Sequence, residues 1–128
     1  MISPEVSIAW DKLKESAGAY PPSAFTFVQE GLRYTVERLR EHDADEDERH
    51  VSGQELCLGL RDYALNQYGP LARTVLDSWN VKRTEDFGRM VFAMVDAKLL
   101  RKTEEDNQAD FEGVYDFDEA FAVEVGLC

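Results

Sequence analysis

The sequence predicts a mainly helical fold with a small β-hairpin. Large apolar residues between 51 and 103 recur at helical spacing, three successive segments there carry helix start and stop signals, and two short apolar segments suit a hairpin. Three helices closed by a hairpin form the winged-helix arrangement, a variant of the helix-turn-helix unit. We expect one domain over residues 1–128, made of a helical pair (1–41), an acidic linker (42–51), a winged-helix-like unit (52–117) and a C-terminal tail (118–128).

The N-terminal segment is typical of two amphipathic helices. Ser3-Pro4 favours a first helix start, because proline suits the first helical position. After the rigid connector 20–22, Ser23 is the expected cap of a second helix, whose apolar stripe runs from Phe25 to Leu39. Both stripes need a surface to cover them, and we expect the helical core that follows to supply it.

The winged-helix-like unit begins with the clearest boundary in the chain. Ser52 and Glu55 have the spacing of a capping box, and Val51 and Leu56 occupy the flanking staple positions. Gly69 ends this first helix, and Pro70 begins a short second helix that ends near residue 79.

The third helix, residues 84–99, has the strongest apolar periodicity. Thr84 is its expected cap, and Glu85 and Asp86 favour the positive end of the helix dipole. We expect 99–103 to pair with 113–117 as the wing, across a polar loop that contains Phe111.

Composition is that of an ordinary core with a strongly acidic exterior. The chain is 44% hydrophobic, and its 14 basic and 26 acidic residues give a net charge of −12. Cys57 and Cys128 are not expected to form a structural disulfide. The sequence shows neither a basic leader before an apolar run nor a stretch long enough to span a membrane, so we expect a cytoplasmic protein without a membrane partner.

Metal and cofactor motifs are incomplete. Asp43, Asp45 and Asp47 imitate the opening of an EF-hand, but Glu48 stands where glycine is needed and Gln54 where the bidentate glutamate belongs. The sequence contains no HExxH, CxxC, GxSxG or glycine-rich nucleotide motif. We expect no metal, no cofactor and no catalytic residue; an enzyme that uses surface carboxylates is the third hypothesis for function.

Charge argues against nucleic acid, although the predicted fold is common among DNA readers. The segment 82–102 carries six basic residues against three acidic ones, a surplus of three. DNA readers typically neutralise about 6–10 phosphates, and the predicted wing loop here is acidic. A DNA-associated transcriptional regulator that uses the 84–99 helix is therefore the alternative hypothesis.

A non-catalytic protein-interaction or adaptor module is the leading hypothesis. An acidic exterior discourages polyanions and suits a basic protein partner. The candidate interaction surface consists of Lys82, Arg83, Arg89, Arg101 and Phe111. For Phe111, however, we favour a core anchor that folds back into the protein over an exposed contact, and Trp79 is likewise expected in the core more than at a contact.

Several long motifs resemble a family of small bacterial proteins restricted to planctomycetes and verrucomicrobia. The resemblance covers most of the chain, and it lies in RHVSGQEL, YGPLARTVLDSW, TEDFGRMVFAMVDAKLL and KTEEDNQADFEGVYDFDEAF. The family has no established activity, ligand or catalytic residue, so the resemblance implies no functional site.

Overall fold

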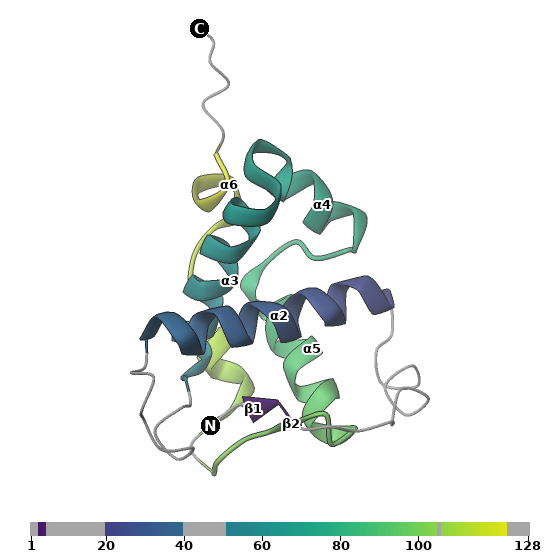
Figure 1. The fold of residues 1–128 in the computed structure, drawn as a ribbon, viewed down its shortest axis with the longest axis vertical. Helices are drawn as coiled ribbons and strands as arrows, with labels where there is room; N and C mark the ends of the chain where they lie inside the picture. Colours follow the sequence, from purple (N-terminus) through teal and green to yellow (C-terminus); the bar gives the residue numbers. More distant parts are fainter. Residues whose placement is uncertain (1–2, 5–19, 40–50, 105, 123–128) are drawn as a thin grey trace, which may run out of the picture.

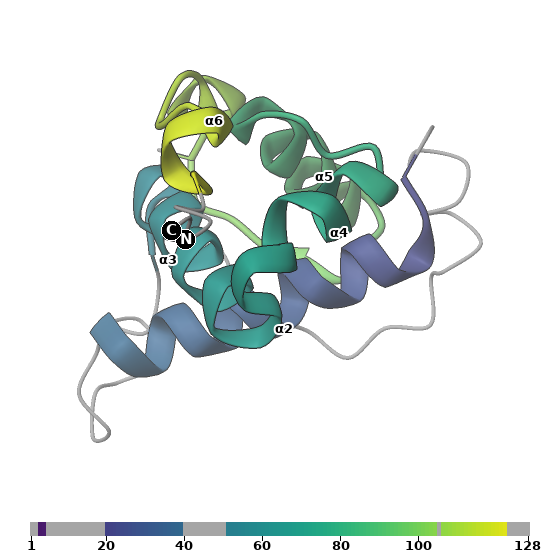
Figure 2. The same ribbon diagram turned by 90° about the horizontal axis from the view of Figure 1, so that it is seen from above.

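The computed structural model describes residues 3–4, 20–39, 51–104 and 106–122, and these ranges are mainly helical, as predicted (Figure 1). The helices are α2 (Pro22–Leu39), α3 (Gly53–Tyr68), α4 (Ala72–Ser78), α5 (Thr84–Asp96) and α6 (Phe117–Ala120). Two 3-10 turns, η2 (Gly69–Leu71) and η3 (Gln108–Phe111), complete the helical elements. Figures 1 and 2 show α2 lying across α3 and α5. None of the described helices is long and apolar enough to cross a membrane.

The predicted wing is wrong. Leu100 and Arg101 form strand β2 (Leu100–Arg101), which pairs antiparallel with β1 (Ser3–Pro4) rather than with residues 113–117. The latter segment is a turn that leads into α6. Ser3 and Pro4 were expected to start a helix, and they are extended instead; the missing amide of proline is tolerated because β1 has a single neighbour. The rest of that predicted helix, and residues 42–50 of the predicted linker, lie outside the described residues.

The capping box that begins α3 is confirmed. The amide of Glu55 donates to Ser52 Oγ at 3.0 Å, and the amide of Ser52 donates to Glu55 Oε1 at 2.9 Å. Gly69 follows the last residue of α3 with a φ of +52°, the left-handed conformation that glycine tolerates best. Local sequence signals therefore set both ends of this helix.

Two other predicted caps are wrong. α2 begins at Pro22, one residue before Ser23. At the start of α5, the Thr84 hydroxyl donates to the carbonyl of Phe111 at 2.7 Å and accepts from the amide of Val114 at 3.2 Å. The carboxylate of Asp86 replaces it as the capping group, because it accepts from the amide of Arg83 at 3.1 Å.

α5 ends three residues earlier than predicted, at Asp96. Lys98 adopts a φ of +63°, and the amide of Leu99 donates back to the carbonyl of Met94 at 2.8 Å. This 6→1 hydrogen bond is the helix-ending arrangement that usually has glycine at the left-handed position. The chain then turns into β2.

Small residues let α2 and α3 cross closely. A Cβ added at Gly59 would lie 1.8 Å from Thr35 Oγ1, and one at Gly31 would lie 2.3 Å from Leu60 Cδ2. Thr35 is itself fixed, because its hydroxyl donates to the carbonyl of Gly31 at 2.7 Å. The crossing therefore depends on glycine at two positions that face each other's helix.

Candidate interaction surface

The basic residues predicted to form a contact surface are exposed, but two of them already form ion pairs with acidic neighbours. Lys82 Nζ lies 3.4 Å from Asp77 Oδ1, and Arg89 Nη1 lies 2.5 Å from Asp86 Oδ1. Lys82 and Arg83 lie in the turn before α5, Arg89 lies on α5, and Arg101 lies on β2. The backbone amides of Lys82 and Arg83 and the guanidinium of Arg89 all donate to Asp86. Arg101 belongs to a separate element.

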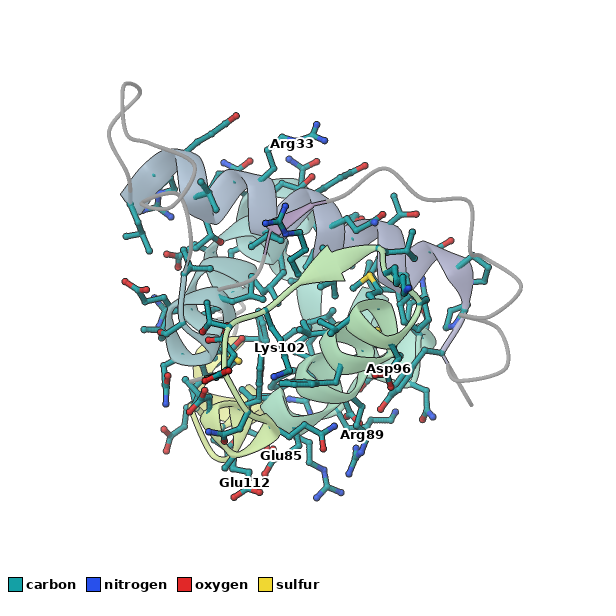
Figure 3. The ribbon with its side chains drawn as sticks, turned by 90° about the horizontal axis from the view of Figure 1, so that it is seen from below. Arg33, Glu85, Arg89, Asp96, Lys102 and Glu112 are labelled. Carbon is teal, nitrogen blue, oxygen red and sulfur yellow. The ribbon has the colours of Figure 1, made fainter. Side chains whose placement is uncertain are left out.

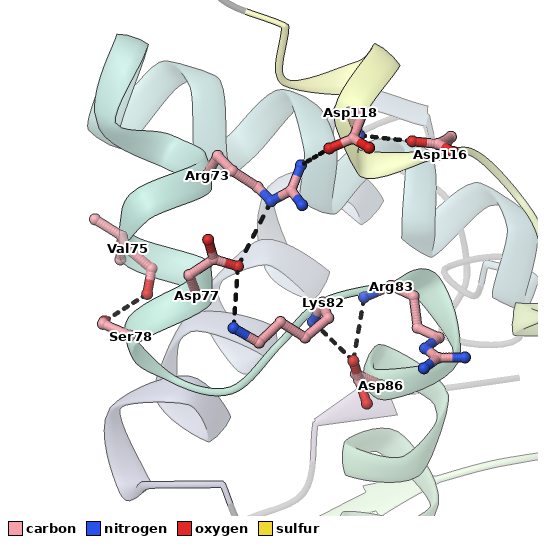
Figure 4. A network of polar contacts seen from close by, with 9 residues as sticks. All are labelled: Arg73, Val75, Asp77, Ser78, Lys82, Arg83, Asp86, Asp116 and Asp118. Carbon is pink, nitrogen blue, oxygen red and sulfur yellow. Dashed lines mark hydrogen bonds and ion pairs between the residues drawn. The ribbon is translucent and has the colours of Figure 1, made fainter.

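The Asp86 carboxylate accepts hydrogen bonds from four donors. The amides of Lys82 at 2.7 Å and Arg83 at 3.1 Å are two of them (Figure 4). The Arg89 guanidinium and the Tyr20 hydroxyl are the others. Asp86 is 5% exposed, and this set of donors compensates for the burial of its charge. Burial and the hydrogen bond to Asp86 raise the pKa of Tyr20. The cluster explains how the α4–α5 turn is held, which is a structural role.

Helix α5 has little free surface for a DNA groove. Eight of its thirteen residues are buried, and the remaining surface is a narrow strip along one side. Glu85, Arg89 and Asp96 lie on this strip (Figure 3), which carries two acids against one base and hence a charge of −1. A recognition helix must present several side chains to base edges and phosphates. The strip, with its charge of −1, gives the regulator hypothesis no specific support.

Phe111 is buried and is therefore a core anchor, the favoured alternative, and not an exposed contact residue. It is 1% exposed, and its ring lies between the start of α3 and α5. A Cβ added at Gly53 would lie 2.9 Å from Phe111 Cε1, and one at Gly88 would lie 2.9 Å from Phe111 Cβ. The ring also meets Phe92 edge-on, with 6.2 Å between ring centroids. Burial of the ring between Gly53 and Gly88 is favourable although the neighbouring loop residues are acidic. Phe111 therefore anchors this loop to the core and is not exposed for contact with a partner.

No group of three or more potential metal ligands occurs among the described side chains. The residues that imitate an EF-hand, at 43–47, lie outside the described ranges. Cys57 is buried, and desolvation followed by the charge of Glu85 raises the pKa of its thiol well above the usual range. A thiol held in its protonated form is a poor nucleophile and a poor metal ligand.

An aromatic cluster, which the sequence did not reveal, lies where α2, α3 and α4 meet. The buried ring of Phe27 has three partly buried aromatic neighbours, with centroid distances of 5.5 Å to Tyr63, 5.5 Å to Trp79 and 6.2 Å to Tyr68. Tyr34 extends the cluster, 5.1 Å from Tyr63. The four outer rings are only partly buried, whereas Phe27 is 3% exposed. We call these five residues the aromatic junction.

An apolar stripe on α4 borders the aromatic junction. Leu71 ends η2, Val75 lies in α4 and Trp79 directly follows α4. The three residues are spaced four apart, which places them along one side of this helical segment. Leu71 is 62% exposed, the largest exposed fraction among the large hydrophobic residues described, and Trp79 also contacts Tyr68 with a centroid distance of 6.1 Å. The stripe and the aromatic junction therefore share Trp79, and together they form an apolar surface with aromatic edges.

Polar groups border this surface beside Tyr34 and Tyr63. The Tyr63 hydroxyl donates to Glu30 Oε2 at 2.8 Å, and partial burial together with this hydrogen bond raises the pKa of Tyr63 to about 12. The Arg38 guanidinium lies 5.2 Å from the centroid of the Tyr34 ring and bridges to Asp62 at 3.0 Å. An apolar centre inside a polar rim is the usual anatomy of a protein-binding site.

The described part of the chain is thus a mainly helical fold with an aromatic surface at a three-helix junction. Comparison with family models, curated proteins and solved structures gave no significant match. The resemblance to the planctomycete and verrucomicrobial family therefore remains a prediction.

Proposed function

We propose that the protein is a non-catalytic protein-interaction module that acts in the cytoplasm. The observation that supports this most strongly is the surface made by the aromatic junction and the Leu71–Val75–Trp79 stripe. Tyrosine and tryptophan are the residues most enriched among those that dominate binding energy, and partly buried rings lose little entropy on binding. The rings are already packed against Phe27, so a partner meets a preformed surface.

The expected partner is a protein that offers aliphatic side chains surrounded by basic residues. Aliphatic groups complement a stripe that contains no ionised side chain of its own. Basic residues around them complement the chain's net charge of −12, which attracts a positive partner and repels polyanions. Long-range attraction of this kind acts mainly on the association rate, while the apolar contact acts mainly on dissociation.

Substitution of Leu71 separates this surface from the rest of the molecule. Leu71→Glu places a charge at the most exposed point of the stripe, and we expect it to weaken binding of the partner by about tenfold or more. The matched control is Thr26→Glu, which adds the same charge at an exposed position of α2. Both variants should retain the wild-type circular dichroism spectrum and melting temperature.

The measurement uses the purified chain. Proteins retained from the host extract by the wild-type chain and by Thr26→Glu, but not by Leu71→Glu, are purified and titrated individually by calorimetry. A purified partner that binds Leu71→Glu as tightly as wild type would contradict the proposed surface. Submicromolar binding to duplex DNA at physiological salt would contradict the proposed function and favour the regulator hypothesis instead.

A further inference from the structure

A second exposed apolar face lies on α3, apart from the α4 stripe. Leu58 is 40% exposed and Leu65 is 37% exposed. They are seven positions apart in the sequence, so they lie two turns apart on the same side of the helix. This side is opposite the buried residues Leu56, Leu60 and Ala64. Arg61 and Asp62 lie between the two leucines, and we call these four residues the outer face of α3.

Arg61 and Asp62 of this face balance each other, and Arg38 of α2 adds a positive charge beside them, whereas the whole chain is strongly acidic. Arg61 Nη2 lies 3.0 Å from Asp62 Oδ1, and Arg38 Nη1 approaches the other carboxylate oxygen of Asp62 at 3.0 Å. These three residues sum to +1 in a chain of net charge −12. The outer face is thus a place where two copies of the chain can approach with little repulsion, because it lacks the surplus of acids found elsewhere.

We propose that the outer face of α3 binds the same face of a second copy, with the two α3 helices parallel and related by a two-fold axis along them. This axis places Leu58 against Leu58 and Leu65 against Leu65 in successive layers, as in a parallel coiled coil. The same rotation carries Arg61 of one copy to the edge where Asp62 of the other lies. Each Arg61 therefore faces an Asp62 across the interface, twice per dimer.

The antiparallel arrangement lacks this complementarity. A two-fold axis perpendicular to the helices brings Arg61 opposite Arg61 and Asp62 opposite Asp62. Like charges placed opposite each other are destabilising, so the sequence order of the two residues selects the parallel pair.

The end of α2 is compatible with the parallel pair. Figures 1 and 2 show the C-terminal end of α2 extending past α3, and Arg38 joins this end to the Asp62 edge of the outer face. The two-fold axis places the two α2 ends at opposite edges of the interface, so they flank the helix pair without meeting. Leu39, 46% exposed at the end of α2, adds apolar surface at each edge. A contact made by so few residues is expected to give weak, concentration-dependent association and not a permanent dimer.

Sedimentation velocity over a wide range of concentration tests the association itself. We expect the sedimentation coefficient of the wild-type chain to rise toward that of a dimer with concentration. Leu58→Glu/Leu65→Glu should lower the association constant by about tenfold or more, because it places four acids in one interface. The control Thr26→Glu/Thr74→Glu carries the same added charge at exposed positions elsewhere and should associate as the wild type does, apart from a small general repulsion.

Charge reversal tests the pairing. Arg61→Asp alone places acid against acid and should weaken association. The triple variant Arg38→Glu/Arg61→Asp/Asp62→Arg reverses the sign of every pair and should restore most of it. Equal weakening by the single and triple variants would overturn the proposed contact between Arg61 and Asp62.

Cysteine cross-linking tests the orientation. In a Cys128→Ser background, Leu58→Cys and Leu65→Cys should each form disulfide dimers alone, because identical positions face each other in the parallel pair. Cross-links that form only between the two different variants would establish the antiparallel pair and overturn the proposal. So would a wild-type chain that sediments as a monomer throughout. A monomer that still binds a partner through Leu71 would leave the proposed function intact.

Discussion

At the scale of single residues, a missing methyl group at position 59 sets how closely α2 approaches α3. We expect Gly59→Ala to destabilise the fold by about 1–3 kcal/mol, despite the better helix propensity of alanine, because the new Cβ would overlap Thr35. Urea denaturation followed by circular dichroism measures the change. Gln67→Ala, at an exposed position of the same helix, should change the free energy of unfolding by less than about 0.5 kcal/mol.

The side chain of Thr35, which a Cβ at position 59 would overlap, can be shortened as well. Thr35→Ala deletes the two side-chain atoms that lie 1.8 Å and 2.7 Å from the added Cβ. In the Gly59→Ala background it should therefore recover part of the lost stability, so that the two substitutions are not additive. Strict additivity would show that the crossing relaxes by another route.

At this scale the sequence favours burial of Phe111 but does not show where its ring packs. Its neighbours along the chain are Asp110 and Glu112, which give no indication of the packing partners. The ring packs against Gly53 and Gly88, which are distant in sequence. Because glycine has no side chain, neither position indicates from the sequence that an aromatic ring packs there. Thr84 holds the same loop through Phe111 and Val114, and this is why its hydroxyl is not available to cap α5.

At the scale of elements, helices were predictable where periodicity and caps agreed. The capping box at Ser52, the stop at Gly69 and the apolar stripe of α5 all follow from residues near in sequence. Ends set by tertiary contacts were not predictable. Asp86, and not Thr84, caps α5. The same carboxylate accepts a hydrogen bond from Tyr20, which lies far away in the chain.

The end of α5 offers a stabilising substitution. Lys98 has a φ of +63°, a conformation that costs an ordinary side chain about 1 kcal/mol relative to glycine. We expect Lys98→Gly to raise the free energy of unfolding by about 0.5–1 kcal/mol, measured by thermal and urea unfolding. Lys98→Ala removes the same charge without relieving the backbone and should not stabilise. A loss of stability in the glycine variant would show that the lysine side chain contributes more than its backbone costs.

At the scale of the whole molecule, the mainly helical class was predictable and the closure of the chain was not. Leu100 and Arg101 pair with Ser3–Pro4, far away in the sequence, and not with residues 113–117 as the predicted winged helix requires. The aromatic junction was unpredictable for the same reason. Phe27 lies in α2, Tyr63 in α3 and Trp79 at the end of α4. Each residue considered alone is typical of a hydrophobic core, so the sequence does not show that the three rings meet.

The aromatic junction also gives the molecule a dependence on alkaline pH. The pKa of Tyr63 is raised from 10.0 to about 12, so the unfolded chain loses this proton at lower pH than the folded chain. The contribution of Tyr63 to stability is therefore complete below pH 10 and is lost as the pH rises toward about 12. Urea unfolding across this range should show a decline that is shallower in Tyr63→Phe. An equally steep decline in that variant would assign the effect to other groups.

The seat of Phe111 has a consequence for how this protein can vary over time. An alanine at position 88 would place its Cβ 2.9 Å from Phe111 Cβ, and an alanine at position 53 would place its Cβ 2.7 Å from Asp110 Cβ. A smaller side chain at position 111 keeps both of these atoms and removes only the ring contacts. Both glycines should therefore persist across a lineage even where the ring is lost.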